Sequence, residues 1–209
     1  PVLYQKLGLA YQNTGNLSEA LKQYLRYELA DDSNLWNIRH IAICYRGLRQ
    51  TDKALAYYKK AEDLAPNKLA TYLNIGHCLL ELNQPKEALD YYFKAELADD
   101  KHTHKAWRPI AWTAFVCGQY EQSEKYHKRI LEETEASSQD VMNYAHLLFV
   151  QGKVSDAIAH YAKALGMAES EQAFFTAFNA DIAVLRAKCP PHADVALLHD
   201  AIKFKSQSI

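Results

Sequence analysis

The sequence repeats itself with a period of about 34 residues, and this period constrains the fold more than any other feature. Positions 4, 7, 8, 11, 20 and 24 of each unit hold apolar or small residues in most units. One extra residue enters between Lys101 and His104, after which the frame resumes. The five units contain, in this order, Tyr4, Leu7, Gly8, Tyr11, Ala20 and Tyr24; Ile38, Ile41, Ala42, Tyr45, Ala54 and Tyr58; Tyr72, Ile75, Gly76, Leu79, Ala88 and Tyr92; Trp107, Ile110, Ala111, Ala114, Ser123 and His127; Val141, Tyr144, Ala145, Leu148, Ala157 and Tyr161. Each unit is therefore one module that buries its apolar face only by stacking on its neighbours.

The spacing predicts two helices in every unit. Positions 4, 7, 8 and 11 share one face of a helix with 3.6 residues per turn, and positions 20, 24 and 27 share a face of a second helix. Residues that tolerate a left-handed turn at a helix end separate the two helices in four units: Gly15, Asn83, Gly118 and Gly152. Pro109 falls inside the first helix of the fourth unit, so we expect that helix to start late, near Trp107, or to kink.

Composition narrows the class of protein. Among 209 residues, Lys and Arg number 24 and Asp and Glu 25, and this balance disfavours a nucleic-acid partner. No apolar run approaches the roughly 20 residues that span a bilayer, so no membrane association is expected. The four cysteines form no CxxC pair, which favours buried free thiols in a reducing, cytoplasmic location. Because the chain opens at Pro1 within a helical pattern, we interpret it as a piece of a longer chain.

The repeated residues resemble the tetratricopeptide repeat, whose pattern is Trp-x2-Leu-Gly-x2-Tyr, then Ala-x3-Phe, then Pro, over about 34 residues. Tyr4-x2-Leu7-Gly8-x2-Tyr11 with Ala20-x3-Tyr24 matches it closely. The resemblance implies an all-α fold, a right-handed α-solenoid superhelix of stacked antiparallel helix pairs with about twelve helices. It predicts a single domain over residues 1–209, with repeats at 1–34, 35–68, 69–103, 104–137 and 138–171. Residues 172–209 would form a capping helix pair, interrupted at Cys189-Pro190-Pro191 and resuming at Ala193.

The resemblance also implies that the first helix of each repeat faces a concave groove. The candidate peptide-binding residues in that groove are Trp36, Arg39, His40, Arg46, Asn74, His77, Lys105, Arg108, Trp112, Asn143 and His146. This set is basic and aromatic, which favours a protein or peptide partner with an acidic or free C-terminal segment. Some family members clamp a C-terminal carboxylate, and Arg39, Asn74 and Lys105 fill three of the five positions used for this. Ile43 and Pro109 depart from the other two.

Three functional hypotheses follow. A non-catalytic interaction scaffold without a cofactor is favoured, because the chain has no phosphate-binding Gly loop, no GxSxG and no HExxH. A metal-dependent enzyme is the alternative that His102-x-His104 suggests, together with Asp99-Asp100 and His77. The third is a self-associating assembly module, resembling a secretion chaperone. Its homo-oligomer contact would lie in the N-terminal repeat, where Leu3, Leu7 and Leu17 leave apolar surface uncovered.

Overall fold

The computed structural model describes residues 2–189 and 195–206, which form two compact units divided between Ala106 and Trp107. Pro1, the Pro190-Pro191 break, the predicted helix start at Ala193 and the end of the predicted capping pair at 207–209 lie outside the described residues. The described residues form twelve helices and no strand, as the repeat pattern predicts. None of these helices is long and apolar enough to cross a membrane.

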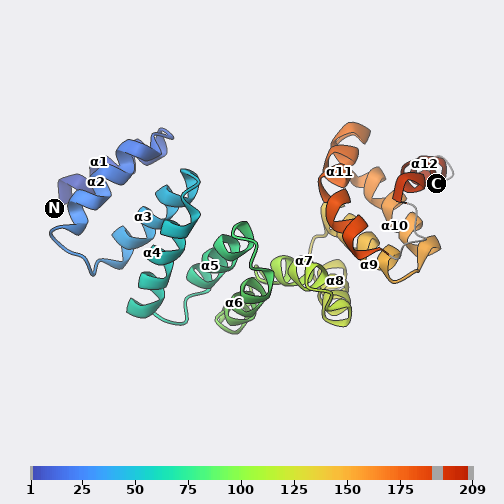
Figure 1. Ribbon diagram of the computed structural model, residues 1–209, viewed down its shortest axis with the longest axis horizontal. Helices are drawn as coiled ribbons and strands as arrows, with labels where there is room; N and C mark the ends of the chain where they lie inside the picture. The colour runs from blue at the N-terminus through green and yellow to red at the C-terminus, as the bar shows by residue number, and fades with distance from the viewer. Residues whose placement is uncertain (1, 190–194, 207–209) are drawn as a thin grey trace. The chain divides into compact units, whose positions relative to one another are not determined.

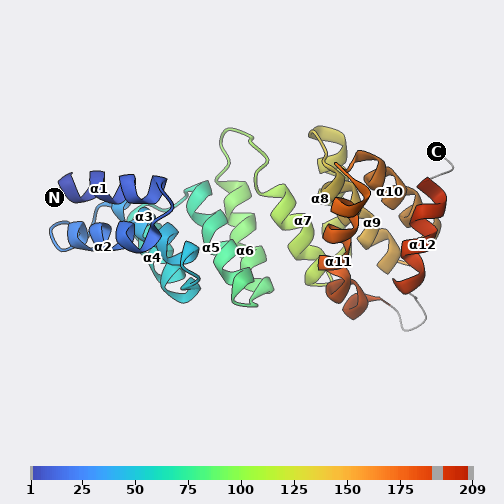
Figure 2. The same ribbon diagram turned by 90° about the horizontal axis from the view of Figure 1, so that it is seen from above.

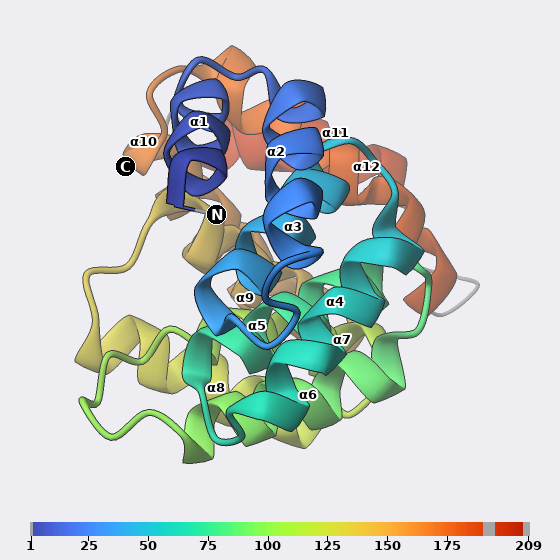
Figure 3. The same ribbon diagram turned by 90° about the vertical axis from the view of Figure 1, so that its left-hand side faces the viewer.

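The first unit consists of three antiparallel helix pairs, which Figures 1 and 2 show in succession. Its helices are α1 (Val2–Asn13), α2 (Leu17–Glu28), α3 (Leu35–Gly47), α4 (Thr51–Leu64), α5 (Leu69–Glu81) and α6 (Pro85–Leu97). Figure 3 looks at this unit from its N-terminal end and shows α1 and α2 side by side. The pairs correspond to the predicted repeats at 1–34, 35–68 and 69–103.

Close approach of the two helices in a pair depends on small residues at fixed positions. Ala20, Ala54 and Ala88 are fully buried where the second helix meets the first. A Cβ atom added at Gly8 would lie 2.4 Å from the ring of Tyr24, so glycine lets that ring lie flat on α1.

The second helices of the first unit are joined by a repeated polar contact. The Glu28 carboxylate on α2 accepts a hydrogen bond from the Tyr57 hydroxyl and pairs with the Lys60 ammonium on α4, each at 2.8 Å. The same three residue types recur one repeat later in Glu62, Tyr91 and Lys94, at 3.1 and 3.6 Å. The second helices α2, α4 and α6 therefore contact one another at equivalent positions in successive repeats and form one row. The first helices α1, α3 and α5 form a separate row, called the first-helix row below.

The second unit contains α7 (Trp107–Val116), α8 (Tyr120–Glu133), α9 (Ser138–Val150), α10 (Val154–Met167), α11 (Glu171–Lys188) and α12 (Val195–Ser206). The late start predicted for the Pro109 helix is confirmed, because α7 begins at Trp107 and places the proline in its first turn, where no intrahelical amide bond is lost. Phe115, Tyr161, Phe178 and Ile202 belong to one buried cluster that joins α7, α10, α11 and α12. The last two helices thus close the core of this unit.

Candidate functional site

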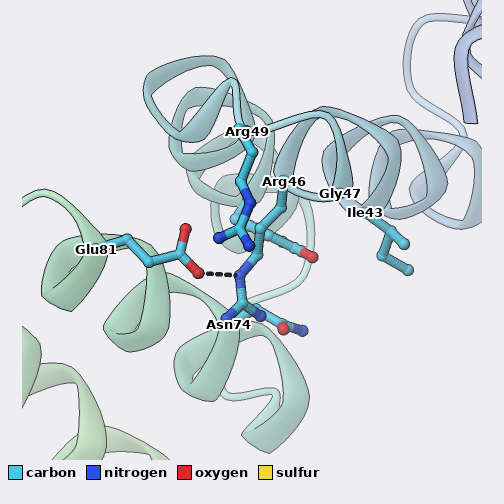
Figure 4. A pocket seen from close by; sticks show the side chains of 7 residues that line it. Ile43, Arg46, Gly47, Arg49, Asn74 and Glu81 are labelled. Atoms are coloured by element: carbon cyan, nitrogen blue, oxygen red, sulfur yellow. Dashed lines mark hydrogen bonds and ion pairs between the residues drawn. The ribbon is translucent and has the colours of Figure 1, made fainter. Parts of the chain in front are cut away.

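A groove opens between α3 and α5 of the first unit, with a cavity volume of about 430 Å³. Helix α3 and the turn after it, α4 and α5 all contribute to its wall. The lining residues are Ile43, Arg46, Gly47, Arg49, Tyr58, Asn74 and Glu81. Figure 4 shows Arg46 and Arg49 extending into this space, with Glu81 facing them from α5. The groove is therefore polar on one side and has Ile43, which is 39% exposed, as an apolar wall.

Two of its charges are already paired. Nε of Arg46 donates to Oε1 of Glu81 at 2.9 Å, and the Thr51 hydroxyl donates to Oε2 of Glu81 at the same distance. Both oxygens of Glu81 are thus engaged, and its carboxylate links α5 to α3 and α4. The pair is about one-third exposed, so we assign it a positioning role more than a large stabilisation.

Arg49 supplies an additional positive charge. It follows the end of α3 with φ of 61°, at the turn position where the first, fourth and fifth units have glycine. Its side chain forms no hydrogen bond or ion pair with any residue that the structure describes. Because Glu81 is held by Arg46 and Thr51, the groove has one cation in excess of its anions.

The floor of the groove includes Tyr58, which is only 2% exposed. Burial raises the pKa of its hydroxyl to about 12, so the group is a protonated donor at neutral pH. Asn74 lies on the opposite wall, where its side-chain amide nitrogen donates to the Ala70 carbonyl at 2.8 Å. That bond uses one N–H and leaves the second N–H and the amide oxygen of Asn74 for other partners.

The predicted residues Trp36, Arg39 and His40 lie along the same first-helix row, N-terminal to the groove lining on α3. The Trp36 and His40 rings lie with their centroids 3.8 Å apart and their planes tilted by 36°, and Nδ1 of His40 is 2.8 Å from the Gln12 amide oxygen on α1. Burial lowers the pKa of His40, which favours its neutral form. Nη2 of Arg39 donates to the Thr71 hydroxyl on α5 at 2.9 Å. These side chains join neighbouring first helices, and Trp36 remains 40% exposed.

His77 and Lys105 have different surroundings from those residues. Nδ1 of His77 lies 2.7 Å from the Tyr92 hydroxyl, and burial, followed by the nearby Arg46 charge, lowers the pKa of this imidazole. Lys105 is exposed in the segment after α6 and is not one of the groove-lining residues. The three residues proposed for a carboxylate clamp, Arg39, Asn74 and Lys105, therefore do not line one groove together.

The remaining four predicted residues belong to the second unit, where internal contacts hold them. Arg108 forms an ion pair with Asp140 at 2.9 Å, and Asn143 accepts a hydrogen bond from Gln139 at 2.8 Å. The Trp112 ring packs near Phe115 and His146. His146 requires a correction, because its side chain is 1% exposed and its Nδ1 is 2.6 Å from the Tyr161 hydroxyl. A ligand does not reach a ring that is enclosed in this way.

The candidate metal cluster has another explanation. The Asp99 carboxylate accepts hydrogen bonds from the Thr103 hydroxyl at 3.0 Å and from the His104 amide at 2.9 Å, so it closes the loop after α6. Within residues 2–189 and 195–206, no group of three or more His, Cys, Asp or Glu side chains is arranged to hold a metal ion.

Comparisons with known proteins agree with this architecture. Two models described as tetratricopeptide repeat match residues 2–33 and 31–96. Residues 2–96 therefore carry repeats of the tetratricopeptide family. No curated protein sequence matches it significantly.

Several solved structures share the tetratricopeptide fold. MamA from Desulfovibrio magneticus RS-1 is 17% identical and aligns over 79% of this chain and 93% of its own, with a TM-score of 0.72. A tetratricopeptide repeat protein from Parabacteroides merdae is 20% identical over 97% of this chain and 82% of its own, with a TM-score of 0.68. A thermophilic protein of the family from Thermus thermophilus is 18% identical over 86% and 97%, with a TM-score of 0.61. At these identities the likeness establishes the fold alone.

Sequence reasoning did not identify Arg49 and Tyr58 as groove residues. Arg49 occupies a repeat position that normally ends a helix, and Tyr58 occupies a core position of the tetratricopeptide repeat. Two signals in the sequence point to them. An arginine replaces glycine or asparagine at the turn, and Ile43 replaces the histidine found at the same repeat position in His77 and His146.

Proposed function

We propose that this protein is a non-catalytic interaction scaffold that binds a peptide or helix of a partner protein in the α3–α5 groove. Stacked repeats of this kind commonly bind partners through extended concave surfaces. The observation that carries the proposal is the combination, in one groove, of the exposed Ile43 side chain and the unpaired Arg49 guanidinium. An apolar anchor beside a charged donor is typical of peptide-recognition surfaces.

The charge of the groove supports an acidic partner. The described lining has two arginines, Arg46 and Arg49, and one carboxylate, Glu81, although the whole chain has a net charge of -1. Arg39 adds a further cation on the same helix. Complementary charge of this kind increases the rate of association and disfavours basic partners.

A peptide array tests the proposal with two matched variants. Ile43→Glu places a carboxylate in the groove wall, and Leu29→Glu makes a similar apolar-to-acidic exchange at a site that is 89% exposed at the end of α2. We expect the wild type and Leu29→Glu to bind the same acidic peptides and Ile43→Glu to lose them. Equal binding by both variants would place the interaction surface elsewhere and refute the proposal that the peptide binds in the α3–α5 groove.

Self-association is a second candidate, supported by the apolar surface of α1. Leu3 and Leu7 are 65% and 38% exposed, whereas Asn37 and Ile41 at the same repeat positions are fully buried by the preceding helix pair. A second copy of the chain that packs on this surface would bury it. Light scattering over a range of protein concentrations should then show a dimer that Leu3→Asp/Leu7→Asp converts to monomer. A concentration-independent monomer would exclude this candidate.

A further inference from the structure

The hydroxyl of Tyr58 differs from those of its counterparts in the other repeats. Tyrosine occupies position 24 in four of the five repeats, and all four side chains are nearly or fully buried. Three of the hydroxyls have a partner on the first helix of their own pair. Tyr24 donates to the Gln12 amide oxygen at 2.9 Å, and Tyr92 and Tyr161 lie 2.7 and 2.6 Å from the Nδ1 atoms of His77 and His146.

Tyr58 has no such partner among the described residues. The histidine position of its repeat is occupied by Ile43, which has no polar atom. The Tyr58 hydroxyl is also not one of the fully enclosed polar atoms that lack a hydrogen bond, so it reaches the groove that Tyr58 lines. A donor that is buried to this extent and left without a protein acceptor requires one from outside.

We propose that the α3–α5 groove holds a carboxylate group of the bound peptide, with the Tyr58 hydroxyl and the Arg49 guanidinium as its donors. This inference rests on the proposed function and adds the chemistry of the group that is recognised. It identifies one anionic subsite within the groove and one residue, Tyr58, that the repeat pattern assigns to the core.

The charge and the donor groups of the groove favour an anion over a neutral acceptor. Among the described residues, Glu81 is the only carboxylate that lines the groove, and Arg46 and Thr51 engage both of its oxygens. Arg49 therefore has no internal counter-ion there. Because its pKa is raised to about 12, Tyr58 stays protonated and donates to an incoming oxygen. Hydrogen bonds between such donors and a carboxylate are charge-assisted and stronger than those to a neutral amide.

The groove also has an apolar side beside this subsite. Ile43 forms that side and is 39% exposed, so it is available to an apolar side chain of the peptide. The Asn74 amide on the opposite wall has a second N–H that is not used by its bond to Ala70. Three donors, from α4, α5 and the turn after α3, thus face one cavity of about 430 Å³.

Three short peptides test the inference directly. The probes are Ac-Ala-Ala-Glu-Ala-Ala-NH2, its Gln counterpart, and Ac-Ala-Ala-Ala-Ala-Ala with a free C-terminal carboxylate. Binding is followed by NMR of protein labelled at the tyrosine Cζ carbon, with the Tyr58 signal assigned from Tyr58→Phe. We expect the Glu peptide, the free-carboxylate peptide, or both, to shift the Tyr58 signal in a saturable way, and the Gln peptide to leave it unchanged. The two carboxylate peptides distinguish a side-chain from a C-terminal source.

Two variants that each remove one proposed donor, and one control variant, test which side chains bind the carboxylate. Tyr58→Phe removes a hydroxyl that makes no internal bond, so its unfolding midpoint should match that of the wild type while its affinity falls about 10- to 100-fold. Arg49→Ala should weaken binding of the same peptides. Tyr92→Phe is the matched control, which loses its contact with His77 but keeps its affinity. Equal affinity of Tyr58→Phe, or a Tyr58 signal that responds to all three peptides alike, would overturn the inference. If array peptides still require Ile43 in that case, the proposed groove function stands without this subsite.

Discussion

Arg108, which the sequence pattern predicts to bind a peptide, instead forms an ion pair whose contribution to stability can be tested quantitatively. Its guanidinium reaches Asp140 through Nε at 2.9 and 3.0 Å and through Nη2 at 2.9 Å. The same carboxylate completes a capping box at the start of α9, where it accepts from the Ser137 amide and hydroxyl, each at 2.8 Å. Asp140→Asn keeps the shape of the side chain but leaves a single acceptor oxygen for both groups. The exchange therefore removes either the Arg108 bond to Oδ1 or the bonds that Oδ2 accepts from Ser137 and Arg108, and the remaining bonds lose the negative charge of their acceptor.

The expected loss follows from these contacts. A lost N-terminal cap interaction costs about 1 kcal/mol, and hydrogen bonds to a charged group contribute about 1.5–3 kcal/mol. Arg108 has a side chain that is 48% exposed, so it regains water when its partner is removed, and we take the lower end of that range. Asp140→Asn should accordingly destabilise the second unit by about 2–3 kcal/mol. Asp156→Asn is the matched control, because Asp156 is the third residue of α10, as Asp140 is of α9, but has no ion pair among the described residues.

Urea unfolding followed by tryptophan fluorescence measures the difference. In a Trp36→Phe background the signal comes from Trp107 and Trp112, both in the second unit. Asp156→Asn should cost less than about 1 kcal/mol, which is the range of a helix-dipole contact alone. A loss for Asp140→Asn no greater than that of the control would refute the reasoning and make the Arg108 side chain available for a ligand.

The difference in unfolding free energy between wild type and Asp140→Asn should depend on pH. Burial raises the pKa of Asp140, but the hydrogen bonds from Arg108 and Ser137 outweigh this, and its pKa in the folded chain is lowered. The contribution of this carboxylate is therefore complete above the unfolded pKa of about 3.9 and is lost as the pH falls through the folded value. The stability difference between wild type and Asp140→Asn should vanish in that acidic window.

Three further predictions concern buried or partly buried groups. Burial lowers the pKa of His127 to about 4, and neither ring nitrogen has a described partner, so the free energy of unfolding should fall as the pH drops from about 6.5 to 4. His127→Phe should reduce this pH dependence and stabilise the protein by about 1–2 kcal/mol, measured by urea titration at pH 7 and 5. Burial raises the pKa of the Cys44 and Cys78 thiols to about 11, so Ellman's reagent should reach them only in denaturant; rapid native reaction would contradict this. Glu28→Gln should cost about 0.5–1 kcal/mol by weakening the α2–α4 contact to Tyr57, and an unchanged melting curve would argue against that link.

The helix pairs could be predicted from the sequence because they depend on local periodicity. Burial of positions 4, 7, 8, 20 and 24 recurs in the second to fifth repeats, and the single insertion before Trp107 shifts the frame without changing it. Pro109 further restricts where α7 begins, since a proline is tolerated in the first turn of a helix but not in its interior. The prediction of one domain over 1–209 stays a prediction, and the structure describes two compact units.

The candidate site was less predictable because it depends on which neighbours satisfy each polar side chain. Position 5 of one repeat reaches position 3 of the next in both Arg39–Thr71 and Arg108–Asp140. Helical-face reasoning assigns both arginines to a ligand surface. It does not show that an aspartate at the facing position holds Arg108. To distinguish an arginine that is held by the next repeat from one that is available to a ligand, the pairing of positions between adjacent repeats must be known.

The difference between a structural and a functional tyrosine at position 24 leads to a last prediction. His77 and His146 engage Tyr92 and Tyr161 from position 9, and Ile43 leaves Tyr58 without that partner. Ile43→His should supply the missing acceptor and reproduce the geometry of the other repeats. Satisfying a buried hydroxyl contributes about 1 kcal/mol, so the variant should unfold at higher urea concentration.

The same substitution should weaken binding of carboxylate peptides, because the Tyr58 hydroxyl would then be occupied from within the chain. Higher stability together with lower affinity would show that the departure from the repeat pattern at Ile43 creates the binding site at the expense of stability. Ile43→Val is the control, since it keeps the position apolar and leaves the hydroxyl unpaired. If Ile43→His bound peptides as well as Ile43→Val does, Tyr58 would not be a ligand donor, and the acidic preference of the groove would rest on its arginines alone.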